Sequence, residues 1–234
     1  SLKPDYPEAH NNLGIALKDQ GDLNAAIDSY NKALSLKPDY PEAHNNLGIA
    51  LKDQGDLNAA IDSYNKVLSL KPNYPDAHYN LGIALQEQGD LTAAIDSYKQ
   101  AIQLKPNLPD AHYNLGVALQ EQGDLNAAID SYNKVLSLKP DYPEAHNNLG
   151  NALKEQGDPN AAITSYKQAI QLKPNYPEAH YNMGLALQKQ DDLTAAIDSY
   201  NKALSLKPEY PEAHNNLGFA LKDQGDLTAA IASY

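Results

Sequence analysis

PEAHNNLGIALKDQGDLNAAIDSYNKALSLKPDY, residues 7–40, is the stretch of sequence that decides the fold. The next 34 residues repeat it with two changes, and the same period continues to the end of the chain. We number the copies one to seven; they span residues 7–40, 41–74, 75–108, 109–142, 143–176, 177–210 and the partial 211–234, while residues 1–6 match the end of a copy. A fixed period of this length is typical of a solenoid, in which each unit packs on its neighbours. We therefore predict one continuous array over residues 1–234.

Two helices are predicted in each copy, and the first copy shows why. Pro7 suits the first position of a helix because its missing N–H is not needed there. Gly21 ends this first helix since glycine adopts positive φ easily, and the Asp22 side chain is a typical cap for the second helix. We expect the first helix over about Pro7–Gln20 and the second over about Leu23–Leu36. Apolar residues recur at three- and four-residue spacing in both segments, so the predicted fold class is all-α.

Composition excludes several classes of function. The 234 residues include 30 acidic and 18 basic ones, which gives a net charge of −12. An acidic surface repels phosphate backbones, so neither nucleic acid nor an anionic membrane is an expected partner. The chain has no cysteine, which excludes disulfides and thiolate metal sites, and no apolar run approaches the roughly 20 residues of a membrane span. We expect a cytoplasmic protein. We also expect the sequence to be a fragment of a longer protein, because Ser1 lies partway through a copy.

One pattern in every copy resembles the tetratricopeptide repeat (TPR) family. In the first copy it consists of Leu13-Gly14, Leu17, Ala26, Tyr30, Ala33 and Pro38. The surrounding phrases are similar to those of the TPR arrays in O-GlcNAc transferase-like and SPINDLY-like enzymes, although His10 and Leu17 stand where the family usually has aromatic residues. The resemblance implies a right-handed superhelical α-solenoid whose first helices line a concave groove. It also implies a scaffold that binds proteins or extended peptides and is not itself an enzyme.

An asparagine recurs at the Asn12 position of every copy. These residues, which we call the ladder asparagines, are Asn12, Asn46, Asn80, Asn114, Asn148, Asn182 and Asn216. A side-chain amide both donates and accepts, so a row of amides can pair with the backbone of an extended peptide. In the enzymes named above a similar ladder holds peptide in this way, and the resemblance implies the same role here. The alternative role is a structural hydrogen bond to the neighbouring copy.

Positions beside the ladder vary among the copies and are candidate selectivity residues. The Asn11 position becomes tyrosine in three copies, at Tyr79, Tyr113 and Tyr181. The Ile15 position, one turn from the ladder, supplies the further candidates Ile15, Ile49, Ile83 and Phe219. Drift between duplicated copies explains this variation equally well. The acidic residue at Glu8 and its equivalents favours a basic peptide, or else serves the helix dipole.

The remaining motifs predict no metal, no cofactor and no catalysis. Each copy has one histidine, starting at His10. Packed helices lie about 8–10 Å apart, too far for histidines of successive copies to share a metal ion, so we expect packing roles. No phosphate-binding glycine loop or singular catalytic constellation is present. Two alternatives to a free-standing scaffold stay open: a substrate-recruiting arm of a larger enzyme such as a glycosyltransferase, and an assembly module that associates head to tail through apolar ends.

Overall fold

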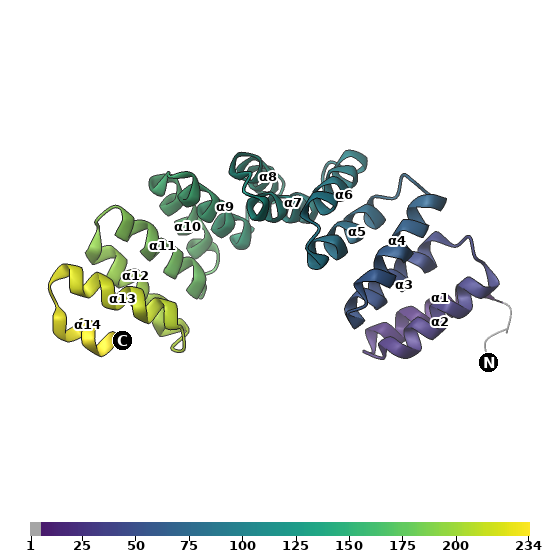
Figure 1. Ribbon diagram of the computed structural model, residues 1–234, viewed down its shortest axis with the longest axis horizontal. Helices are drawn as coiled ribbons and strands as arrows, with labels where there is room; N and C mark the ends of the chain where they lie inside the picture. Colours follow the sequence, from purple (N-terminus) through teal and green to yellow (C-terminus); the bar gives the residue numbers. More distant parts are fainter. Residues whose placement is uncertain (1–5) are drawn as a thin grey trace. The chain divides into compact units, whose positions relative to one another are not determined.

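The computed structural model describes residues 6–234, and helices are the only regular secondary structure in that range (Figure 1). The helices are α1 (Pro7–Asp19), α2 (Leu23–Leu36), α3 (Pro41–Gln54), α4 (Leu57–Leu70), α5 (Pro75–Gln88), α6 (Leu91–Leu104), α7 (Pro109–Gln122), α8 (Leu125–Leu138), α9 (Pro143–Gln156), α10 (Pro159–Leu172), α11 (Pro177–Lys189), α12 (Leu193–Leu206), α13 (Pro211–Gln224) and α14 (Leu227–Ser233). They belong to two compact units, residues 1–118 and 119–234, whose limit falls within α7. The predicted all-α class, with one helix pair in each copy, is confirmed.

The sequence signals at the helix ends act as predicted. Asp22 Oδ1 accepts a hydrogen bond from the Ala25 backbone N–H at 3.0 Å and caps α2, and the equivalent aspartate caps each later second helix. Gly21 adopts a φ of 89° after α1. Asp191 replaces this glycine after α11 and still adopts a φ of 64°, a conformation that costs a residue with a Cβ roughly 1 kcal/mol. Both α1 and α11 end one residue earlier than we predicted, a difference within the usual fraying of helix ends.

A buried tyrosine under a glycine holds each helix pair together. The tyrosines of the second helices have no exposed surface; they are Tyr30, Tyr64, Tyr98, Tyr132, Tyr166 and Tyr200. The ring lies so close to the first helix that a Cβ added to Gly14 would stand 2.5 Å from Tyr30 Cε1. Only a residue without a side chain allows this approach, which explains the glycine in every copy.

Successive copies join by packing the first helix of one copy on the second helix of the copy before. In unit 1, Ala26 and Tyr30 of α2 form a buried cluster with Leu47 and Ala50 of α3. The same cluster recurs in unit 2 between α12 and α13. We call the boundary between two successive copies the seam.

The described ends of the chain leave seam surfaces uncovered. Leu13 of α1 is 37% exposed, whereas its equivalent Leu47 is 8% exposed. On α14, Leu227 and Ile231 are 62% and 77% exposed. Apolar side chains are therefore exposed on both the first and the last of the described helices. None of the described helices combines the length and the apolar character that crossing a bilayer requires.

Candidate functional site

Five ladder asparagines donate a hydrogen bond across a seam, and the first helices of neighbouring copies supply both partners. In unit 1, Nδ2 of Asn46 donates to Asn11 Oδ1 at 3.0 Å, and Nδ2 of Asn80 donates to Asn45 Oδ1 at 3.2 Å. The remaining seam bonds have the same form and are Asn114 to Tyr79 Oη (3.2 Å), Asn182 to Asn147 Oδ1 (3.1 Å) and Asn216 to Tyr181 Oη (2.8 Å). The ladder amides thus have the structural role that was the alternative in the sequence analysis. Whether they also hold a ligand depends on what the seam bond leaves over.

In three ladder amides the seam bond uses one N–H, and the rest of the amide is left over. A side-chain amide has two N–H donors and an oxygen that accepts. For Asn46, Asn80 and Asn182 the second N–H and the oxygen make no hydrogen bond within residues 6–234. All three side chains are half-buried, while Asn12 of the first copy is exposed. The seam bond therefore fixes the orientation of the amide and leaves a donor and an acceptor for a ligand.

The Asn11 position supplies the oxygen that receives the seam bond. Asn11, Asn45 and Asn147 are between 5% and 7% exposed. Where a tyrosine replaces the asparagine, as at Tyr79 and Tyr181, its hydroxyl oxygen accepts instead. The change from asparagine to tyrosine thus keeps an acceptor for the ladder amide of the next copy. The sequence analysis did not predict this hydrogen bond between positions 35 residues apart.

The three tyrosines at the Asn11 position are half-buried. Two of them pack against other tyrosine rings. The Tyr79 ring centroid lies 6.1 Å from that of the buried Tyr98. The Tyr181 ring lies 6.0 Å from Tyr200 and 4.9 Å from Tyr210. Burial raises the pKa of Tyr181, although the hydrogen bond from Asn216 opposes that effect. Tyr113, the third of these residues, is also half-buried, so the tyrosines offer a ligand only part of their rings.

The Ile15 position contributes the apolar surface beside the ladder. Ile15 is 37% exposed and Phe219 is 44% exposed, whereas Ile49 and Ile83 are half-buried. The Phe219 ring packs edge-on against Tyr234, with centroids 5.9 Å apart. Spacing of three residues puts the Asn12, Ile15 and Lys18 positions on one side of the first helix. We call this side the ladder face.

Under the ladder face, the buried tyrosine hydroxyls find partners in some copies only. Each of three glutamines at the Lys18 position accepts from the tyrosine of its copy: Tyr98 to Gln86 (2.9 Å), Tyr132 to Gln120 (3.1 Å) and Tyr200 to Gln188 (2.8 Å). Copy five has Lys154 at this position, and its Tyr166 hydroxyl donates to Asn151 at 2.8 Å instead. The hydroxyls of Tyr30 and Tyr64 are buried without a partner. Burial raises the pKa of Tyr30 to about 12, and the nearby Asp19 adds to this effect.

Three of the acidic residues at the Glu8 position, Glu8, Glu144 and Glu178, have a lysine partner within the chain. Glu8 lies 3.5 Å from the Lys37 ammonium, and Glu144 accepts a hydrogen bond from Lys173 at 3.0 Å. Burial acts to raise the pKa of Glu144, but the Lys173 hydrogen bond, a backbone hydrogen bond and nearby positive charge together lower it. These ion pairs give the acidic row a structural role alongside its place near the helix N-termini.

Histidines of successive copies bond to the preceding loop. His44 Nε2 lies 2.8 Å from the Pro38 carbonyl oxygen, and His180 Nε2 lies 3.1 Å from that of Pro174. A carbonyl only accepts, so Nε2 carries the proton in these contacts. Between residues 6 and 234, no three histidine, aspartate or glutamate side chains gather as metal ligands would.

Comparison with known proteins agrees with this architecture. The sequence model of the TPR repeat family matches residues 16–55, 50–89, 85–123, 119–157, 150–191 and 189–225. The chain belongs to the TPR family. A search of curated proteins gave no match.

Solved TPR structures share the fold over most of the chain. A crystal structure of MamA is 32% identical, covers 69% of this chain and 94% of its own, and has a TM-score of 0.66. YrrB, described as a TPR protein with an unusual peptide-binding site, is 21% identical over 80% of this chain and 96% of its own, with a TM-score of 0.70. A chain of the APC/C hetero-tetramer Cut9-Hcn1 is 21% identical over 94% of this chain and 44% of its own, with a TM-score of 0.72. TPR scaffolds of this kind are protein-interaction modules.

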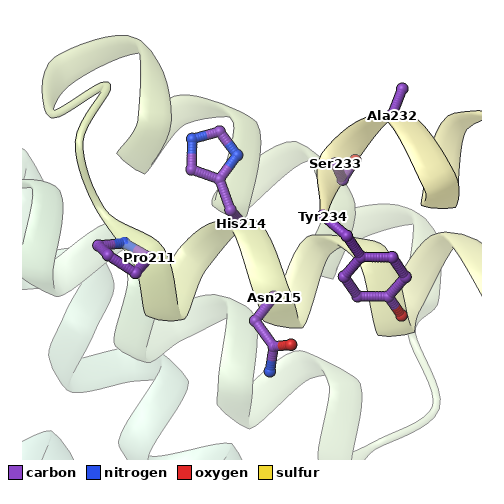
Figure 2. Close-up of a pocket in the computed structure, with 6 residues that line it drawn as sticks. All are labelled: Pro211, His214, Asn215, Ala232, Ser233 and Tyr234. Carbon is purple, nitrogen blue, oxygen red and sulfur yellow. The ribbon is translucent and has the colours of Figure 1, made fainter.

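The last TPR copy has a pocket at its uncovered seam surface. Its cavity of about 390 Å³ is lined by Pro211, His214 and Asn215 of α13 and by Ala232, Ser233 and Tyr234 at the end of the chain (Figure 2). In the preceding copy, the equivalent surface of α11 and α12 contacts α13. Tyr181 and Tyr200, the equivalents of Asn215 and Tyr234, lie against α13, so the pocket adjoins the uncovered seam surface.

Proposed function

We propose that this TPR protein is a scaffold that holds an extended peptide or protein segment along the ladder face of a single array. The observation that carries the proposal is the seam bond. It orients the amides of Asn46, Asn80 and Asn182 and uses one N–H of each, so that a second N–H and an oxygen are left for a ligand. An extended peptide offers alternating backbone donors and acceptors to such a row. Orientation before binding also lowers the entropy lost when the ligand arrives.

Selectivity would come from the residues beside the amides. Ile15 and Phe219 are the more exposed of the apolar candidates, so they are the ones a ligand side chain meets most directly. The partly buried rings of Tyr79, Tyr113 and Tyr181 would contribute edges and hydroxyl groups. Their main effect on a ligand is to set the orientation of the next ladder amide through the seam bond.

Paired asparagine variants test this function. Asn46→Ala with Asn80→Ala removes two ladder amides, while Asn31→Ala with Asn65→Ala removes two exposed asparagines of the second helices as a matched control. On a peptide array, we expect the ladder variant to lose most binding and the control to keep it. Thermal unfolding of both variants separates lost seam bonds from lost ligand contacts. Equal binding by the parent and a folded ladder variant would refute the ladder as the binding device.

A second candidate function, head-to-tail self-association, is favoured by the uncovered ends. Residues 7–19 of α1 are identical to residues 41–53 of α3, which pack on α2. Leu13 and Ala16 of one molecule could therefore dock on Ala230 and Ile231 of another, as Leu217 and Ala220 dock in the α12–α13 seam. Such a contact does not close on itself. Sedimentation should show association that grows with concentration and is lost in Ile231→Glu; a monomer at all concentrations would exclude it.

A further inference from the structure

In unit 2, a glutamine at the Lys18 position joins a buried tyrosine to the next copy. Gln120 Oε1 accepts a hydrogen bond from the Tyr132 hydroxyl at 3.1 Å, and Gln120 Nε2 donates to Glu155 Oε1 at 2.9 Å. Tyr132 belongs to the same copy as Gln120, whereas Glu155 belongs to the copy after it. A primary amide both accepts and donates, so it can join a hydroxyl donor to a carboxylate acceptor.

In unit 1, copies two and three have the same two partners without the glutamine. Tyr64 and Glu87 are the equivalents of Tyr132 and Glu155, two repeat periods earlier, and Lys52 stands at the glutamine position. Tyr64 is fully buried, and its hydroxyl has no hydrogen-bond partner in the described part of the chain. A buried polar group without a partner costs free energy, so a ligand that accepts from this hydroxyl gains that free energy on binding.

Lys52 takes the place of the glutamine but cannot do what it does. In copies three, four and six the tyrosine hydroxyl donates to the side chain at the Lys18 position, and a lysine has no acceptor to offer there. The Lys52 ammonium lies 2.9 Å from Asp53 Oδ1 and 4.0 Å from Glu87 Oε1. Asp53 follows Lys52 on α3, so the flexible lysine side chain can keep this ion pair while it turns away from Tyr64.

We propose that Tyr64 and Glu87 form a subsite for the primary amide of a glutamine side chain in the bound peptide. The amide oxygen accepts from the Tyr64 hydroxyl and an amide N–H donates to Glu87, as the Gln120 amide does two copies later. The ligand thus supplies the glutamine that copy two lacks. This subsite rests on the proposed function, because a peptide along the ladder face passes Lys52.

The charge around the hydroxyl favours an amide over a carboxylate. Burial raises the pKa of Tyr64, and the carboxylates of Asp53 and Glu87 raise it further, so the phenol keeps its proton and stays a donor. The same two carboxylates repel an acidic side chain. Tyr30 of copy one also lacks a partner, but the acid that follows it is the shorter Asp53, which already pairs with Lys52. The subsite is therefore specific to copies two and three.

Peptides that differ at one position test the subsite. A peptide chosen from the array carries Gln, Glu or Leu in turn at each position, and calorimetry measures its affinity for the full chain. Two hydrogen bonds, one of them to a carboxylate, predict one position at which Gln binds about tenfold more tightly than Leu, equal to about 1.4 kcal/mol. Glu at that position should bind no more tightly than Leu. Equal affinity for Gln and Leu at every position would overturn the subsite, as would a preference for Glu.

Matched variants connect the preference to Tyr64. Lys52→Gln gives the Tyr64 hydroxyl an internal acceptor and should bring the Gln and Leu peptides to equal affinity. Lys66→Gln, the same change at an exposed lysine of α4, should keep the preference. Tyr64→Phe removes the donor and keeps the ring, so it should abolish the preference, whereas Tyr98→Phe, whose hydroxyl already has an acceptor, should not. A preference that survives Lys52→Gln contradicts the proposal.

Propionamide and propionate provide a readout that needs no peptide. Propionamide should shift the NMR signals of the Tyr64 ring in a saturable way, and propionate should not. Lys52→Gln should remove the response. A parent chain that responds to propionamide while no array peptide binds would refute the scaffold function and leave the amide subsite standing. Tyr64 signals that stay in place with propionamide would overturn the subsite.

Discussion

Copies two and three of unit 1 and copies five and six of unit 2 have equivalent helices that differ in some of their polar side chains. A shift of 102 residues relates them. Tyr64 and Tyr166 are fully buried in both, and each lies against its glycine. On the ladder face, however, Ile49 corresponds to Asn151 and Glu87 to Lys189. The comparison teaches that the buried tyrosine–glycine contacts are constant, whereas the hydrogen-bond partner of the tyrosine hydroxyl and the charge on the ladder face change.

The differences are coupled to particular contacts. Copies two and five carry lysine at the Lys18 position, Lys52 and Lys154, and a lysine cannot accept from the buried tyrosine. Copy five compensates with Asn151, and Tyr166 gains a partner. Copy two has Ile49 there, and the Tyr64 hydroxyl has none. Among Tyr30, Tyr64 and Tyr166, whose copies carry lysine at this position, only Tyr166 has an acceptor.

The shared buried tyrosines predict the largest effect, a loss of stability at high pH. Burial raises the pKa of Tyr64 and Tyr166 above the ordinary value, with nearby carboxylates adding to the shift. The unfolded chain then loses phenolic protons from about pH 10, while the folded chain keeps them. Stability is therefore fully present below pH 10 and falls as the pH rises further. Denaturation series at pH 8 to 11.5 should show this fall, and Tyr64→Phe or Tyr166→Phe should each reduce it; a flat profile would contradict the burial argument.

Adding a methyl group at the helix crossing should have the next largest effect, a loss of stability that differs between copies two and five. A Cβ at Gly48 or Gly150 would meet a tyrosine ring carbon at 2.6 Å or 2.5 Å. Overpacking of this kind costs typically about 1–3 kcal/mol. We expect Gly150→Ala to cost more than Gly48→Ala, because moving the Tyr166 ring also breaks its bond to Asn151. Urea unfolding measures both costs, with Asn65→Ala as a surface control, and equal costs would show that the hydroxyl bond does not hold the ring.

Exchanging the acceptor tests the coupling itself. Asn151→Ile leaves the Tyr166 hydroxyl buried without a partner and should cost about 1–2 kcal/mol of unfolding free energy. The reciprocal Ile49→Asn gives Tyr64 the acceptor that it lacks and should cost less, or stabilise the protein. Chemical denaturation of the two variants and of the double variant checks this. Identical costs for both substitutions would remove the compensation from the account.

The turn between the two helices of copy six predicts the smallest effect. Asp191 adopts a φ of 64°, whereas the equivalent Gly89 adopts 92° without strain. Asp191→Gly should therefore raise the unfolding free energy, by about 1 kcal/mol at most, since glycine relieves the strain but increases the entropy of the unfolded chain. Thermal unfolding detects a change of this size. A lower stability in Asp191→Gly would show that the aspartate side chain stabilises the turn.

Sequence reasoning reached the fold because its signals are local and repeated. Pro7, Gly21 and Asp22 mark helix ends within a few residues, and the Gly14–Tyr30 crossing follows from their sizes. The contacts of the site were less accessible. The seam bond from Asn46 to Asn11 links positions 35 residues apart, and the bond from Tyr166 to Asn151 joins the two helices of copy five. Such contacts depend on side-chain direction across a seam, which periodicity does not specify.

The central claim is that a seam-bonded ladder amide still binds peptide backbone, and side-chain amide NMR tests it most directly. An extended peptide chosen from the array is titrated while the Nδ2 signals of Asn46, Asn80 and Asn182 are followed, with the exposed Asn31 and Asn65 as internal controls. The account predicts saturable shifts of the ladder signals and unchanged control signals. Ladder signals that stay in place while the peptide saturates the protein would contradict it.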